Sequence, residues 1–248
     1  MTFDLHYKKP FWTWFIVGVG GAITLGAWVL AVIRKRGVSW NLFSSIALTI
    51  GLVLAVFLGD LNFRFNMSRY YDIANLQVYE DVKPDVDKGS SLMDAGKVYF
   101  ASGTTLDNTR GVGFKNGDVY CVAPIVKDTM TDYDFWAVGK NCCADRADFR
   151  CGEYANRRAR AGLRMMDDED RPFYRLAVVE ATNADSANPM PAPHPLFFYW
   201  MQDPLAAQNA YRDDGFKFFL IAIFSHFAFN LLCVIVATIA FAKIGSRY

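Results

Sequence analysis

The chain has 248 residues, of which 53% are hydrophobic and 16% aromatic, and its formal net charge at pH 7 is +1. Both contents are high for an ordinary soluble domain. A net charge near zero, without a clustered basic face, argues against a nucleic-acid partner. We therefore expect a membrane protein whose first partner is the lipid bilayer.

Three apolar blocks without Asp, Glu, Lys or Arg predict three transmembrane helices. The blocks run over residues 11–33, 42–59 and 218–242. A bilayer core of about 30 Å needs roughly 20 helical residues, so each block can span it, the second only just. A helix of this length in a soluble protein would show a polar stripe, which these blocks lack.

The three blocks also divide the chain into parts. Residues 1–59 hold an N-terminal segment and a transmembrane hairpin, residues 60–217 an extramembrane domain, and residues 218–248 the third transmembrane helix and a short tail. Only the third span separates the domain from the tail, so the domain lies on the opposite side of the membrane from the tail and on the same side as the N-terminus.

The extramembrane domain carries Cys121, Cys142, Cys143 and Cys151, for which zinc ligation, redox chemistry and disulfide bonding are the alternatives. Adjacent cysteines cannot easily both bind one zinc ion, and a redox centre would need Cys-x-x-Cys near a helix start. An even number of cysteines in a small domain favours two disulfides. We expect Cys121 to bond one of the adjacent pair and Cys151 the other, with the choice left open.

The charges that flank the helices bear on the orientation. Arg34, Lys35 and Arg36 lie in a short loop and favour its placement in the cytoplasm, but basic residues on the other side nearly balance them. Disulfides persist in oxidising compartments. We therefore expect the domain in a lumen or outside the cell and the C-terminus in the cytoplasm, while the identity of the membrane stays open.

The first half of the domain predicts strands and the second half helices. "KVYFASG" and "YDFWAVG" are typical of strands, and "GVGFKNGDVYCVAPIV" predicts a hairpin with a type I′ turn at Asn116-Gly117. Residues 147–166 and 167–185 each predict a helix, the second with Pro172 near its start. The expected fold class is a membrane protein with three transmembrane α-helices and a disulfide-bonded α+β domain.

Two further groups of side chains in this domain predict contacts with its surroundings. Arginines at 157, 158, 160 and 164 favour a helix that faces solvent or an acidic partner. An aromatic run follows a proline-rich loop, and aromatic side chains are enriched at the membrane interface. We expect an interfacial aromatic patch made of Phe197, Phe198, Tyr199 and Trp200.

Small and polar residues within the spans predict helix packing. Three small residues four apart in the first span let another helix approach closely, and polar groups in the third span favour a protein interior over lipid. Both groups fit packing among the three helices of the chain or docking into a larger assembly. The residues are Gly18, Ala22 and Gly26 in the first span, and Ser225, His226 and Asn230 in the third.

Five stretches occur in this order before a Phe-rich helix: "GFKNGDVYCVAPIV", "DFWAVGKNCC", "RARAGLRMM", "RPFYRLAV" and "HPLFFYWMQDP". Together they resemble an uncharacterised family of integral membrane proteins of dinoflagellate algae. The resemblance covers Gly111 to the C-terminus and implies a membrane protein with a lumenal domain, without an established activity. In architecture alone the chain is similar to tetraspanins, although it lacks their first span and has Cys-Cys-Ala where they have Cys-Cys-Gly.

No nucleophile, metalloprotease or phosphate-loop motif occurs in the sequence. We therefore expect neither an enzyme nor a cofactor or metal site. The function expected is that of a membrane scaffold or accessory subunit that binds other membrane proteins or further copies of itself. The alternatives are a receptor-like, ligand-binding ectodomain and a component of a channel or transporter.

Overall fold

The computed structural model describes residues 4–33, 40–144, 148–184 and 189–245. The chain forms two compact units, which we call the helical unit and the sheet unit. The helical unit comprises Met1–Arg69 and Tyr211–Tyr248, and the sheet unit comprises Tyr70–Ala210. The predicted loop charges Arg34, Lys35 and Arg36 lie outside the described residues.

Three long apolar helices confirm the predicted transmembrane segments. Within the described residues, the stretches long and apolar enough to cross a membrane are Pro10–Ile33, Trp40–Ala74 and Pro204–Lys243. The elements that build them are α2 (Pro10–Ile33), α3 (Trp40–Asn62), the π-helical turn η1 (Phe63–Met67), α4 (Ser68–Ala74) and α6 (Pro204–Gly245), and a short helix α1 (Asp4–Lys8) precedes them.

The second and third of these stretches are longer than the apolar blocks. At 1.5 Å per residue, 35 residues extend over about 52 Å, well beyond a bilayer core of about 30 Å. Polar side chains at the block ends continue the helix instead of ending it, as in the i,i+4 ion pair between Arg64 and Asp60 at 2.8 Å. The predicted domain limits at 60 and 217 therefore fall inside continuous helix.

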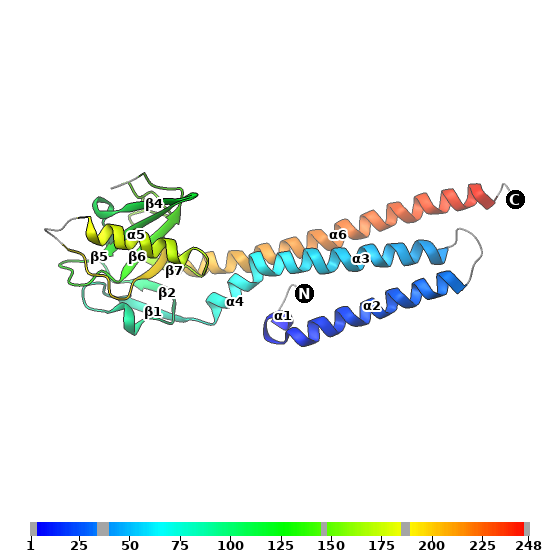
Figure 1. Ribbon diagram of the computed structural model, residues 1–248, viewed down its shortest axis with the longest axis horizontal. Helices are drawn as coiled ribbons and strands as arrows, with labels where there is room; N and C mark the ends of the chain where they lie inside the picture. The colour runs from blue at the N-terminus through cyan, green and yellow to red at the C-terminus, as the bar shows by residue number, and fades with distance from the viewer. Residues whose placement is uncertain (1–3, 34–39, 145–147, 185–188, 246–248) are drawn as a thin grey trace. The chain divides into compact units, whose positions relative to one another are not determined.

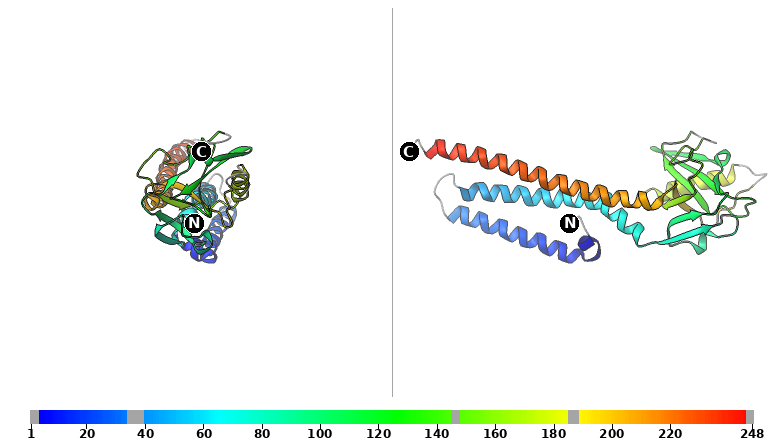
Figure 2. Two further views of the ribbon diagram at one scale, coloured as in Figure 1. Left: turned by 90° about the vertical axis from the view of Figure 1, so that its left-hand side faces the viewer. Right: turned by 180° about the vertical axis from the view of Figure 1, so that it is seen from behind.

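Contacts inside the helical unit place α3 antiparallel to α6 (Figure 1). At one end the Asn62 side chain donates a hydrogen bond to the Gly215 carbonyl oxygen at 2.8 Å. At the other end the rings of Trp40 and Phe241 lie 4.9 Å apart. On its other side α3 contacts α2, where the Trp28 indole N–H donates to the Thr49 hydroxyl at 3.0 Å. The three helices run side by side in Figure 1 and in the right-hand view of Figure 2.

The sheet unit contains one mixed sheet with the strand order β1-β2-β7-β8-β6-β5-β3, and β4 pairs with β5. Among the described residues, β1 with β2 and β6 with β8 are parallel and the other pairs antiparallel. The strands are β1 (Gln77–Val82), β2 (Ala95–Phe100), β3 (Thr105–Leu106), β4 (Val112–Asn116), β5 (Asp118–Val126), β6 (Phe135–Lys140), β7 (Ala161–Arg164) and β8 (Leu196–Met201).

Both faces of this sheet are covered, by different means. Side chains alternate between the faces along each strand, so the core divides into two clusters. Helix α5 (Arg171–Asn183) packs over one face, which we call the helix face (Figure 1). Residues 141–144 and 148–160, which we call the cysteine segment, contribute Phe149, Cys151 and Ala159 to the core of the other, the cysteine face.

The secondary structure corrects one of the two helices predicted from sequence and confirms the other. The helix predicted over 147–166 is wrong: its described residues form turns up to Arg160 and then strand β7, between β2 and β8. Gly162 fits that strand because a Cβ there would lie 2.7 Å from the Cβ of Phe198. The helix predicted over 167–185 is confirmed as α5.

The hairpin is confirmed, but its turn is not type I′. That turn needs φ above zero at both central residues, whereas Gly117 has φ of +74° and Asn116 is not among the residues with positive φ. The register pairs Lys115 with Val119 and Asn116 with Asp118, which centres the turn on Gly117.

Candidate functional site

The sheet unit brings the four predicted cysteines together at the cysteine face. Cys121 lies in the middle of β5, fully buried, while Cys142 and Cys143 directly follow the end of β6. Cys121 bonds Cys143 and Cys142 bonds Cys151, so each member of the adjacent pair has a distant partner. The predicted disulfide-bonded domain is thereby confirmed, and the choice that the sequence left open is made.

Two glycines make room for these disulfides on the strands that flank Cys121. The register places Cys121 opposite Gly113 of β4 and opposite Gly139 of β6, so the three residues form one row across the sheet. A Cβ on Gly113 would lie 2.8 Å from Sγ of Cys143, and a Cβ on Gly139 would lie 2.5 Å from Cβ of Cys151. We call this row the glycine row; it lets both disulfides lie directly against the sheet.

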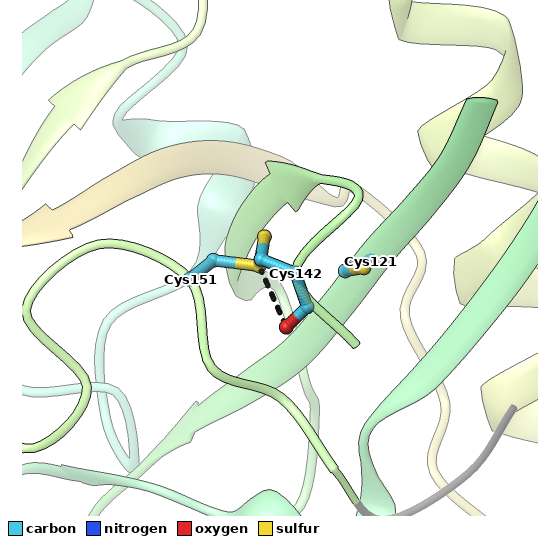
Figure 3. A group of neighbouring side chains, drawn as sticks. All are labelled: Cys121, Cys142 and Cys151. Atoms are coloured by element: carbon cyan, nitrogen blue, oxygen red, sulfur yellow. Dashed lines mark hydrogen bonds between the residues drawn. A yellow bond between two sulfur atoms is a disulfide. The ribbon is translucent and has the colours of Figure 1, made fainter. Parts of the chain in front are cut away.

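The disulfide between Cys142 and Cys151 lies beside the side chain of Cys121 (Figure 3). The Sγ atoms of Cys121, Cys142 and Cys151 lie within 4.8 Å of one another, a grouping that as free thiols would suit a metal ion. The carbonyl oxygen of Cys142 lies 3.7 Å from Sγ of Cys151. Metal ligation needs thiolates, and these three sulfurs are all held in disulfides, Cys121 with Cys143 and Cys142 with Cys151. In this state the cluster holds the cysteine segment on the sheet.

The predicted interfacial aromatic patch is wrong. Residues 197–200 belong to β8, between β6 and β7 in the middle of the sheet. Phe198 and Trp200 point into the core of the cysteine face and Phe197 into that of the helix face. Tyr199 packs against the helix-face core while only partly buried. A strand with both faces covered is a continuous apolar run, which explains why this one looked like a membrane-interface segment.

The predicted packing residues of the spans have unequal surroundings. Gly18, Ala22 and Gly26 are exposed within the helical unit, and a Cβ added at either glycine would meet no atom within 4 Å. Contact with α3 is made by Gly20 instead, where an added Cβ would lie 3.2 Å from Leu52. The small-residue row of α2 therefore takes no part in the packing among the described helices.

The polar residues of the third span, in contrast, are partly used inside the chain. The imidazole of His226 lies over Gly51 of α3, where an added Cβ would be 3.3 Å from Nε2. The Asn230 side-chain nitrogen lies 2.9 Å from the same Nε2 and donates to the His226 carbonyl oxygen at 2.9 Å. Ser225 is exposed within the helical unit.

Asp134 is a structural residue whose role only the fold reveals. It is buried, and its two carboxylate oxygens accept the backbone N–H groups of Gly89 at 2.8 Å and His194 at 2.9 Å. Charge-assisted bonds of this kind are among the strong ones. The carboxylate thus joins two loops that are 45 and 60 residues away in sequence.

Lys97 is a second polar residue of the sheet unit that sequence reasoning missed. It lies on β2, is only 6% exposed, and donates to the Gln208 side-chain oxygen at 2.6 Å. Burial in apolar surroundings disfavours the charged form and lowers the pKa of the Lys97 ammonium from its usual value. The sequence does not reveal this burial, because a buried lysine between apolar residues of a strand has the same sequence pattern as an exposed one.

Comparisons with family models, with curated proteins and with solved structures found no match. The resemblances to the algal family and to tetraspanins therefore stay predictions, and the function has to be inferred from the chain itself.

Proposed function

We propose that this chain is a non-enzymatic scaffold or accessory subunit of a larger membrane assembly, built with other membrane proteins or with further copies of itself. The observation that carries the proposal is the small-residue row of α2. Gly18 and Gly26 have open space in front of them, while the neighbouring Gly20 is already covered by α3. Of the two earlier interpretations, packing among the chain's own helices leaves this row unexplained.

Helices associate in membranes mainly by close packing and hydrogen bonds, because lipid tails are as apolar as leucine. A row of small residues spaced by four lets a second helix approach with large contact area. Ala22 completes the row between the two glycines. The exposed row on α2 thus has the form of a lateral contact surface.

Blue-native electrophoresis after gentle solubilisation tests this proposal on the full chain. We expect migration as a larger species, and we expect the triple substitution Gly18→Leu, Ala22→Leu, Gly26→Leu to shift it to the monomer position. Val19→Leu with Ile23→Leu, on other exposed positions of the same helix, is the matched control and should leave the larger species intact. Migration of the unaltered chain only as a monomer would contradict the proposal.

The disulfides support a placement of the sheet unit in a lumen or outside the cell, with the C-terminus in the cytoplasm, because both bonds persist in an oxidising compartment. Trypsin added to sealed membranes tests this orientation, since exposed arginines lie in the cysteine segment. Cleavage within the cysteine segment is expected from the non-cytoplasmic side alone. Cleavage within that segment from the cytoplasmic side of intact vesicles would reverse the assignment.

The receptor-like alternative is favoured by a separate observation, a pocket in the sheet unit lined by three arginines: Arg157, Arg158 and Arg160.

A further inference from the structure

The arginine pocket lies where β2 ends and β7 begins. Its volume is about 660 Å³. Arg157, Arg158 and Arg160 line it together with Tyr99, Thr104 and Thr105. All these residues belong to the sheet unit. The pocket thus combines three permanent positive charges with three hydroxyl groups.

An ordered turn presents the three arginines. The Asn156 side chain accepts the backbone N–H of Arg158 at 3.0 Å and donates to Glu153 at 2.6 Å and to Gln202 at 3.0 Å. Ala159, between the arginines, is buried in the core of the cysteine face. The Arg160 carbonyl accepts the N–H of Phe100 at 2.8 Å, which joins the turn to β2. The backbone below the guanidinium groups is therefore fixed before any ligand binds.

The charges of this turn have no ion-pair partner in the part of the chain that the structure describes. No carboxylate among the described residues forms an ion pair or hydrogen bond with the side chain of Arg157, Arg158 or Arg160. Carboxylates lie near the pocket without pairing with these arginines: Glu153 accepts from Asn156, and Asp203 accepts the N–H of Ala206 at the start of α6 at 2.9 Å. The charges of Asp203 and Glu80 act on Tyr99.

The hydroxyl groups of the pocket add hydrogen-bonding capacity. Burial, and then the negative charges of Asp203 and Glu80, raise the pKa of Tyr99, so its phenol remains a hydrogen-bond donor at neutral pH. Thr104 is buried, and its Oγ1 has no hydrogen-bond partner within the described part of the chain. An unpaired buried hydroxyl costs free energy, which a polar ligand or water at this site offsets.

We propose that this pocket binds the phosphate group of an anionic ligand, carried either by a soluble phosphate compound or by a lipid headgroup. Planar guanidinium groups donate paired hydrogen bonds that match phosphate oxygens. Three of them around one anion, with hydroxyl donors beside them, give a site selective for a doubly charged oxyanion over a carboxylate. This site is independent of the contact surface proposed on α2.

Binding to the full chain in phosphatidylcholine nanodiscs tests the proposal in two arms. Isothermal titration with inorganic phosphate and inorganic pyrophosphate measures the soluble source. Nanodiscs that also contain a phosphatidylinositol phosphate, followed by native mass spectrometry of the retained lipid, measure the lipid source. We expect saturable binding in at least one arm. The arm that binds identifies the source, and binding in neither arm overturns the proposal.

Three variants separate recognition from bulk charge. Replacing Arg157, Arg158 and Arg160 by Gln should weaken binding at least tenfold. The matched control replaces Arg150, Arg171 and Arg175 by Gln, which removes the same charge elsewhere on the sheet unit and should leave binding unchanged. Equal loss in both triple variants would overturn the proposal, because it would show attraction by net charge alone.

The third variant replaces the three pocket arginines by lysine. Charge is kept but the paired hydrogen-bond geometry is lost. We therefore expect this variant to bind more weakly than the unaltered chain but more tightly than the variant with three Gln residues in the pocket. Unchanged binding by this variant would contradict guanidinium recognition. A count of free thiols under denaturing conditions, which stays at the single Cys233 while both disulfides are formed, together with an unchanged near-ultraviolet circular dichroism spectrum, shows that each variant is folded.

Discussion

The two faces of the sheet are both buried, by covers of opposite kinds. On the helix face, α5 satisfies its own backbone hydrogen bonds and places Tyr174, Ala177 and Ala181 against the strands. On the cysteine face, the cover is a chain segment whose described residues form turns and no helix or strand. Such a segment has few internal hydrogen bonds to hold its shape, and two disulfides supply the missing constraint.

The difference between the covers also appears in the strands below them. A helix meets a sheet through side chains of ordinary size, and the helix face carries Trp136, Val122 and Val138. Disulfides that lie flat on a sheet need space at the backbone, and the glycine row supplies it at Gly113 and Gly139. The strands therefore carry large side chains where the helix covers them and glycines where the disulfides lie against them.

The largest effect is expected from a cavity on the helix face. Tyr174 is 1% exposed, with its ring centroid 5.3 Å from that of Tyr120 and 6.0 Å from that of Phe197. Tyr174→Ala should lower the free energy of unfolding by about 3–5 kcal/mol, as for other large aromatic truncations. Denaturant unfolding followed by near-ultraviolet circular dichroism measures it, and Tyr174→Phe is the conservative control. A loss below 1 kcal/mol would show that α5 contributes little to this face.

Removal of the disulfides tests the other cover. By the chain-entropy relation, replacing Cys121 and Cys143 by Ala should cost about 3.4 kcal/mol for a separation of 22 residues, and replacing Cys142 and Cys151 about 2.6 kcal/mol for a separation of 9. Trypsin should then cleave the cysteine segment faster.

The control for the disulfide variants is Cys233→Ala. Cys233 is the free cysteine of α6, so its loss should change neither the unfolding free energy nor the cleavage rate. Cleavage of the paired variants at the rate of the unaltered chain would mean that the segment is held by packing alone.

The glycine row offers a smaller and more local test. A Cβ at Gly139 would lie 2.7 Å from Sγ of Cys151 and 2.8 Å from Sγ of Cys142. Gly139→Ala should therefore cost about 1–3 kcal/mol through overpacking. Gly21→Ala in α2, where an added Cβ meets nothing within 4 Å, is the matched control.

A double-mutant cycle shows whether the cost of Gly139→Ala comes from the disulfide. In a background without Cys142 and Cys151 the segment can move away, so the cost should fall by at least half. An equal cost in both backgrounds would assign the strain to the strand itself.

The sequence was most informative where one residue type carries a local constraint. Uncharged blocks predicted the three long helices, and the adjacent cysteines predicted disulfides to distant partners. Residues 161–164 and 197–200 were misread because β7 and β8 exist only through their neighbours. Gly162 weakens a helix, but it is the ring of Phe198 that makes it a strand residue. The glycine row was out of reach for the same reason, since register joins Gly113 to Gly139 across 26 residues.

Lys97 extends the comparison to a third cover and gives the smallest effect. Val98 and Phe100 belong to the core of the cysteine face, so Lys97 lies on the opposite side by alternation. There the start of α6 covers it, through the Gln208 side chain, and burial lowers its pKa. Below the folded pKa, both states carry the proton and this group gives no pH dependence.

Between the lowered folded pKa and the usual value of 10.5, the unfolded chain binds more protons than the folded one. The contribution of Lys97 to stability should therefore rise with pH as 10.5 is approached from below. Lys140, whose pKa is raised chiefly by its hydrogen bond to Asp170, loses its contribution only above 10.5. Tyr79, Tyr99, Tyr120 and Tyr174, whose pKa values are raised from 10.0, lower the stability as pH rises above about 10. The contribution of Lys97 is therefore read as the difference between the unaltered chain and Lys97→Met. Lys97→Met should abolish the rise, whereas Lys115→Met, an exposed lysine of β4, should retain it. Unfolding free energies measured from pH 8 upward decide the matter, and an unchanged slope in Lys97→Met would assign the pH dependence to other groups and contradict the prediction for Lys97.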